Sequence, residues 1–248
     1  MLLRTGSTTA IIGALALLIA TTLHPMTADP GDPVAAFTEY AADRWWVASH
    51  LGQFLGVALM FGGIYALARS LQDDPLGWLA NLAVLVGVAA LATAAVLQAV
   101  DGVALKVMVD HWAAAPAAQK PSAFEAAFAV RQVETGIASF TALLFGTAVV
   151  LLGIALAASA LYPAWLGWLG VVGGGGTAAG GVLMAFTGFS HGATNLTMPF
   201  NLALLAWMLA AGIPDVAARW VTEGLASLSS QHPSHAISIV HATEDQPP

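Results

Sequence analysis

Six long stretches of apolar residues limit most strongly what this chain can fold into. A helix needs about 20 apolar residues to cross the hydrocarbon core of a bilayer. Only 8% of the 248 residues are charged, against roughly 25% in soluble domains, and no stretch has the alternating pattern of a membrane β-barrel. The sequence therefore predicts an all-α integral membrane bundle of six transmembrane helices. The expected spans are residues 8–24, 46–68, 76–101, 135–159, 163–189 and 196–213.

The composition also excludes several classes of function. The chain has seven Lys and Arg residues in total, too few to neutralise the phosphates of a nucleic acid. Cysteine is absent, which excludes disulfides, thiolate nucleophiles, iron–sulfur clusters and Cys-ligated zinc. The partner that the composition does predict is the lipid bilayer.

The Lys and Arg residues of the short loops predict how the chain is oriented, because they are enriched on the cytoplasmic side. Arg4, Arg69 and Arg219 fall on one side, against Arg44 and Lys120 on the other. The position of Arg4 directly before the first span decides the assignment. We therefore expect a multi-pass protein of the cell membrane with both termini cytoplasmic.

The segments outside the spans are short except in two places, residues 25–45 and 102–134, which we expect on the outer side. Residues 34–44 are predicted to form a short helix, and residues 103–112 to prolong the third span. The first span has some features of a cleavable secretory signal, but its length and the five later spans favour a retained helix. After the last span, residues 214–226 are predicted to be an amphipathic juxtamembrane segment and residues 227–248 a disordered cytoplasmic tail.

Glycines in the fifth span predict close helix packing. Gly170 and Gly174 are four residues apart, as are Gly176 and Gly180. Small residues at this spacing let two helix backbones approach closely within lipid. Two interpretations stay open: packing against another helix of the same chain, and a homodimer through span five.

Polar residues gather toward the outer ends of the spans, while the inner halves have almost no ionisable side chains. Asp101 and Arg131 are expected to form an ion pair there. Three interpretations remain open: ion pairs that join helix ends, a water-filled pocket that opens outward, and a haem or metal site. The residues expected to line a pocket are His50, Gln98, Asp101, Arg131, Glu134 and His191. The candidate metal or haem ligands are His24, His50, His111 and His191.

Part of the chain matches itself at an offset of 90 residues. The tetrapeptide Leu-Gly-Trp-Leu occurs at residues 76–79 and again at 166–169, each time near a proline that precedes a span. This match predicts that spans two–three and four–five are parallel copies of one hairpin. Repeats of this kind are common in transporters, whose binding sites lie between the copies.

Several short motifs together give the chain a family resemblance. They are His24-Pro25 at the end of span one, the Trp-x-x-x-His-Leu run from Trp46 to Leu51, the two Leu-Gly-Trp-Leu elements and Asp101-Gly102. With these motifs the chain resembles a loose group of multi-pass membrane proteins from actinobacteria and similar organisms. The resemblance implies a membrane bundle and supplies no catalytic residues.

Three functions are therefore compatible with the sequence. The first is a non-enzymatic module that binds a lipid, small molecule or partner protein through a polar pocket near the outer face. The second is a small transporter or permease. The third is an intramembrane redox enzyme that uses haem or a transition metal bound by the outer histidines. No catalytic residue and no definite cofactor are predicted.

Overall fold

The computed structural model describes residues 2–212, and within them every regular element is helical. Gln98 and Asp101 lie in one nearly continuous rod, because α4 passes through a π-helical turn, η1, into α5. The elements are α1 (Leu2–Thr22), α2 (Pro33–Ala42), α3 (Trp46–Ser70), α4 (Gly77–Ala99), η1 (Val100–Leu105), α5 (Lys106–Ala114), α6 (Lys120–Ala158), α7 (Ala164–Thr187) and α8 (His191–Gly212).

Six of these helical rods are long and apolar enough to cross a membrane: α1, α3, α4 with its continuation to Ala114, α6, α7 and α8. The all-α fold with six such helices is therefore confirmed. The expected segments 214–226 and 227–248, together with Arg219, lie outside the described residues.

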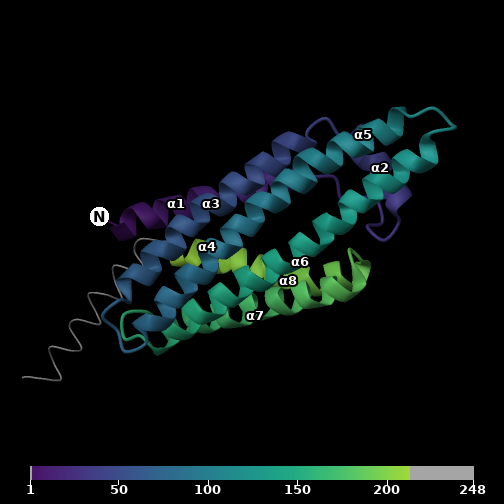
Figure 1. The fold of residues 1–248 in the computed structure, drawn as a ribbon. Coiled ribbons are helices and arrows are strands. Elements are labelled where there is room, and N and C mark those ends of the chain that lie inside the picture. The colour runs from purple at the N-terminus through teal and green to yellow at the C-terminus, as the bar shows by residue number, and fades with distance from the viewer. Residues whose placement is uncertain (1, 213–248) are drawn as a thin grey trace, which may run out of the picture.

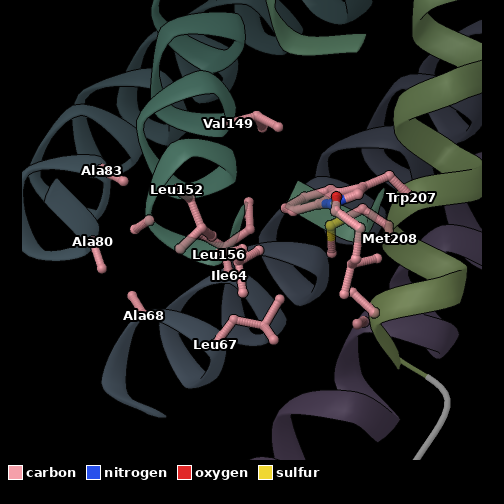
Figure 2. Close-up of a cluster of buried hydrophobic side chains, with 14 of the residues drawn as sticks. Ile64, Leu67, Ala68, Ala80, Ala83, Val149, Leu152, Leu156, Trp207 and Met208 are labelled. Atoms are coloured by element: carbon pink, nitrogen blue, oxygen red, sulfur yellow. The ribbon is translucent and has the colours of Figure 1, made fainter. Parts of the chain in front are cut away.

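The six rods pack in a ring whose order is α1, α3, α4, α6, α7, α8 and back to α1 (Figure 1). An aliphatic core fills one half of the ring, and Figure 2 shows Leu152 and Leu156 of α6 in it beside Trp207 and Met208 of α8. The Trp207 indole Nε1 donates a hydrogen bond of 2.9 Å to the Leu166 carbonyl. This half lies at what we call the turn end, where residues 71–76 and 159–163 connect helices.

Glycines bring neighbouring helices close together at two places in the ring. Gly13 of α1 faces Gly56 of α3, and a Cβ on Gly13 would lie 2.6 Å from the Gly56 carbonyl oxygen. Gly146 of α6 faces Gly174 of α7 in the same way. The other three glycines predicted to pack helices, Gly170, Gly176 and Gly180, face Trp207, Phe200 and Thr197 of α8. All four predicted packing glycines thus contact helices of this same chain.

At the opposite end, α5 and the first part of α6 extend beyond the other helices and carry α2 (Figure 1). We call α2, α5 and residues 120–131 the cap. Residues 120–134 belong to α6, although the sequence placed them before the fourth span, because Ala123 and Ala127 pack into a second hydrophobic cluster. That cluster also contains Phe37, Tyr40, Trp46, Leu105, Val109 and Trp112. The cap end is therefore a packed structure rather than a loop.

Helix α2 is held in place by hydrogen bonds at both of its ends. Asp32 caps its N-terminus by accepting from Val34 N and Ala35 N. At its other end, Lys106 Nζ donates to the Tyr40 and Ala41 carbonyls at 2.9 and 3.1 Å. The Glu39 carboxylate accepts from the backbone N–H groups of residues 27 and 28 at 3.0 Å, and also from the Thr27 hydroxyl. The Glu39 bonds thus fix the α1–α2 linker to α2, and the Lys106 bonds fix α2 to α5.

Candidate metal centre

Three potential metal ligands meet where the cap joins the bundle. His24 follows the end of α1, His50 lies in the first turns of α3, and Asp101 belongs to η1. One ligand atom from each residue lies within 4.8 Å of the other two. The His50 side chain is only 1% exposed and that of Asp101 16%. We call these three residues the His–Asp cluster.

The π-helical turn brings the Asp101 carboxylate to His50. Single π turns within an α-helix are rare and are frequent at functional sites. Trp46 Nε1 donates 3.0 Å to the Asp101 carbonyl, which ties this turn to α3. A Cβ on Gly102 would lie 2.5 Å from His50 Cβ, so only glycine lets the two elements approach this closely. As a result His50 Nε2 lies 3.0 Å from Asp101 Oδ2.

Contacts with backbone carbonyls indicate which nitrogen of each imidazole carries the hydrogen. His24 Nδ1 lies 2.7 Å from the Pro25 carbonyl oxygen, and His50 Nδ1 lies 2.7 Å from the Trp46 carbonyl oxygen. A carbonyl oxygen only accepts, so Nδ1 carries the hydrogen in each ring. Nε2 is then the atom free to bind a metal, and a carbonyl partner on the other nitrogen is the usual outer-shell support of a metal-bound histidine.

The contact between His50 Nε2 and the Asp101 carboxyl group needs a proton or a metal ion between the two atoms. A neutral His50 with its hydrogen on Nδ1 would direct a lone pair at a carboxylate oxygen. Three arrangements make the contact favourable: a second proton on His50, a proton on the Asp101 carboxyl group, or a metal ion that both groups ligate.

Aromatic rings enclose the cluster. The Trp46 ring lies 4.8 Å from the His24 ring and 4.5 Å from the His50 ring, and the Tyr40 ring lies 4.2 Å from Trp46. Burial lowers the pKa of His24, and the neighbouring His50 lowers it further, while Asp101 raises it. The net effect favours the neutral imidazole, which is the form that binds metals.

The two imidazole rings of the cluster lie too close together for a haem. Their centroids are 5.0 Å apart, and the macrocycle of a bis-histidine haem would have to pass between them. One metal ion bound from one side fits this spacing better.

A second charged group lies across Tyr40 from the cluster. Arg131 Nη1 donates to the Tyr40 hydroxyl at 3.1 Å and lies 3.8 Å from Glu134 Oε2. Glu134 is 3% exposed, and its Oε2 has no hydrogen-bond donor among residues 2–212. Burial raises the pKa of the Tyr40 phenol, Arg131 lowers it, and the Glu134 and Asp101 carboxylates both raise it. Tyr40 therefore lies within electrostatic reach of both carboxylates.

The structure pairs some predicted residues differently from expectation. Asp101 contacts His50, and Arg131 contacts Glu134, in place of the expected Asp101–Arg131 ion pair. His191 is 70% exposed and lies 3.1 Å from Asp29 rather than beside His50.

The other predicted residues divide between the cap end and the surface. Gln98 lies at the cap end, where its Nε2 is 3.5 Å from Gln53 Oε1. His111 is exposed on α5. Of the four candidate metal ligands the structure thus brings together His24 and His50.

Sequence reasoning missed the roles of Tyr40 and Trp46. It placed Tyr40 in the short helix of residues 34–44 and used Trp46 only as the start of the Trp-x-x-x-His-Leu run. The one available signal was the i, i+4 spacing of Trp46 and His50, which places both on one helix face.

No protein-family model, curated protein or solved structure matches this chain. Its class therefore follows from the structure alone. The chain is a multi-pass helical membrane protein, with six apolar helices long enough to span a bilayer. Its candidate site is the His–Asp cluster at the cap end.

Proposed function

We propose that this membrane protein binds one divalent transition-metal ion through His24, His50 and Asp101. The observation that carries the proposal is the convergence of two imidazoles, each with Nδ1 bonded to a carbonyl, on one carboxylate. Each ligand comes from a different segment, so the ion would join the end of α1, the start of α3 and η1.

The spacing of the cluster is close to that of a bound metal. Zn²⁺ bonds to nitrogen and oxygen are about 2.0–2.2 Å long, so two ligand atoms of a tetrahedral ion lie about 3.4 Å apart. His50 Nε2 and Asp101 Oδ2 are already within this distance at 3.0 Å. The limit of 4.8 Å for the whole cluster means that its most distant atoms must approach each other by a little over 1 Å. Asp101 Oδ1 is buried and has no hydrogen-bond donor in the described part of the chain, and a metal ion would satisfy it.

The donor set suits borderline metals. Imidazole ligands suit Zn, Cu, Fe and Ni, and two histidines with one carboxylate form the facial triad of non-haem Fe(II) sites. Three protein ligands also leave a coordination position open, as in catalytic zinc sites.

We also propose that the cap end faces outward in the cell membrane. Arg4 and Arg69 both lie toward the turn end of the bundle, because α1 and α3 run antiparallel with Gly6 beside Ala66. The positive-inside rule favours that end in the cytoplasm. A transporter is less well supported, because the turn end of the described bundle is filled by aliphatic side chains.

Metal titration of the purified protein tests the proposal. His232, His235 and His241 would first be replaced by Gln, and a purification tag without histidine used, so that histidines outside the cluster do not bind metal. After chelation and dialysis, Co²⁺ titration followed by visible absorption should saturate at one equivalent. Competition with Zn²⁺ should remove the Co²⁺ spectrum.

Variants of the cluster supply the controls for that titration. His50→Gln and Asp101→Asn should each weaken Co²⁺ binding by at least about tenfold. His111→Gln and His191→Gln should leave it unchanged, because these histidines lie outside the cluster. Failure of the parent protein to bind, or binding unaffected by His50→Gln, would overturn the proposal.

A further inference from the structure

The loop that joins α2 to α3 carries a carboxylate near the His–Asp cluster. Asp43 is the first residue of this loop, and its N–H donates 3.3 Å to the Tyr40 carbonyl at the end of α2. Trp46 begins α3 directly after the loop. The Tyr40 and Trp46 rings contact each other, and the Trp46 ring lies against both His24 and His50. The chain therefore holds Asp43 between two residues that enclose the cluster.

One oxygen of the Asp43 carboxylate has a partner and the other does not. The Trp45 N–H donates 2.7 Å to Asp43 Oδ1. Asp43 Oδ2 is buried and has no hydrogen-bond partner among residues 2–212. Arg44, the next residue, places its guanidinium over the Trp45 ring, and Asp43 forms no ion pair within the described residues. A buried charged acceptor without a partner is unfavourable, so a cation beside Oδ2 would stabilise the protein.

The Asp43 carboxylate interacts electrostatically with both histidines of the cluster. Burial lowers the pKa of His24 and the neighbouring His50 lowers it further, whereas the Asp101 and Asp43 carboxylates both raise it. Asp43 also interacts electrostatically with His50. The loop thus places a negative charge where it favours a positive charge within the cluster.

The charge of a divalent ion calls for a second carboxylate. Two neutral imidazoles and the Asp101 carboxylate would leave one positive charge of the ion uncompensated, and buried charges are unfavourable unless they are paired. Glu134 does not supply the missing charge, because Arg131 already opposes it at 3.8 Å. Asp43 has no such counter-charge, so its carboxylate and that of Asp101 together cancel the charge of the ion.

The coordination number leads to the same residue. Zn²⁺ in structural sites is almost always four-coordinate, and the His–Asp cluster supplies three ligands. Asp43 is not among the groups that lie within 4.8 Å of one another, so its carboxylate has to move toward the ion. Because Asp43 lies in the loop between α2 and α3, this movement does not require either helix to unwind.

We propose that Asp43 is the fourth ligand of the metal ion, through Oδ2, so that two imidazoles and two carboxylates enclose it. The inference deepens the metal proposal and rests on it. It describes a closed and charge-neutral site for a divalent ion, in place of the open position that three ligands leave. The ion would then join the end of α1, the α2–α3 loop, the start of α3 and η1, and so hold the cap to the bundle.

A matched pair of substitutions tests the role of Asp43 in the protein used for the metal titration. Asp43→Asn removes the charge, while the amide oxygen can still accept from the Trp45 N–H. It should weaken Co²⁺ binding by at least about tenfold, as the loss of even a supporting group does in metal sites. Asp74→Asn is the control, because Asp74 Oδ2 is also buried without a partner in the described chain but lies between α3 and α4 at the turn end. Its Co²⁺ affinity should equal that of the parent protein.

An added anion tests whether the site is closed. In Asp43→Ala the fourth position is vacant, so azide should bind to Co²⁺ there and change its visible spectrum. The parent protein, at the same metal occupancy, should show no change with azide. Thermal melts of the metal-free proteins verify that each variant is folded, and added Zn²⁺ should raise the melting temperature less in Asp43→Asn than in Asp74→Asn.

The outcomes distinguish this inference from the metal proposal. Where His50→Gln weakens Co²⁺ binding but Asp43→Asn binds as tightly as the parent protein, the assignment of Asp43 is overturned and the metal proposal stands. A change of the parent spectrum with azide would likewise overturn the assignment of Asp43 alone. Failure of the parent protein to bind Co²⁺ would overturn both.

Discussion

The replacement Gly102→Ala tests how the His–Asp cluster is assembled. A Cβ at this position would lie 2.5 Å from Cβ and 3.0 Å from Cγ of His50. These atoms belong to the base of a buried side chain on α3, not to a flexible end, so they cannot move without moving the helix. The added methyl group must therefore separate η1 from α3 or rotate His50 away from Asp101.

The size of the effect follows from two opposing terms. Overpacking a close contact costs about 1–3 kcal/mol, and replacing Gly with Ala in a helix returns up to about 1 kcal/mol. We expect a net loss of about 1–2 kcal/mol in the free energy of unfolding. Gly136→Ala, which meets open space, should instead gain about 0.5–1 kcal/mol.

Two measurements report the outcome. Equilibrium unfolding in mixed detergent and SDS micelles should rank Gly136→Ala above the parent protein and Gly102→Ala below it. Co²⁺ affinity should fall about 10–100-fold in Gly102→Ala, as for other changes in the support of metal ligands, and stay constant in Gly136→Ala. Unchanged stability together with unchanged affinity in Gly102→Ala would refute the assembly described for the cluster.

Three further predictions concern topology, coupling and pH. Because the chain has no cysteine, a single Cys at Ala117 should react with an impermeant reagent from outside intact cells and one at Gln72 should not; the reverse pattern would invert the topology. In metal-free protein, His50→Gln and Asp101→Asn should be non-additive by about 0.5–3 kcal/mol, while strict additivity would show no interaction. Burial raises the pKa of Glu39, but its hydrogen bonds hold it below the usual value. Its stabilisation of the α1–α2 linker is therefore present at neutral pH and lost as the pH falls through that lowered pKa. Limited proteolysis of the linker should accelerate at acid pH in the parent protein and be fast at every pH in Glu39→Gln; identical profiles would contradict this.

The fold could be predicted because each span is a long apolar segment, and hydrocarbon admits such segments only as helices. The early start of α6 at Lys120 was not predicted. The residues before the fourth span include Lys120, Glu125 and Arg131. Because these side chains are charged, the hydropathy pattern predicts that the segment lies in water outside the membrane. Ala123 and Ala127 of this segment pack into the second hydrophobic cluster. A hydropathy pattern does not contain this tertiary contact.

The internal repeat stays a prediction. Gly56 and Gly146 are 90 residues apart and both lie at close helix contacts. However, Gly56 packs against α1, which precedes it, and Gly146 packs against α7, which follows it. Equivalent positions in the sequence thus meet neighbours that are not equivalent.

The members of the candidate site could be predicted individually but not as a set. His24, His50 and Asp101 come from three separate segments, so no short motif joins them. The contact of His50 with Asp101 also depends on the π-helical turn, which changes the rotation of the rod after Ala99. His191 was predicted to line the same pocket as His50 and Asp101, and it instead contacts Asp29 at the surface.

Anomalous diffraction from crystals grown with Zn²⁺ tests the central claim most directly. Data collected on both sides of the zinc absorption edge locate the ion independently of the protein density. The account predicts a peak about 2.0–2.2 Å from Nε2 of His24, Nε2 of His50 and a carboxylate oxygen of Asp101. The absence of a peak there, with zinc bound only at exposed residues such as His111 or His191, would contradict it.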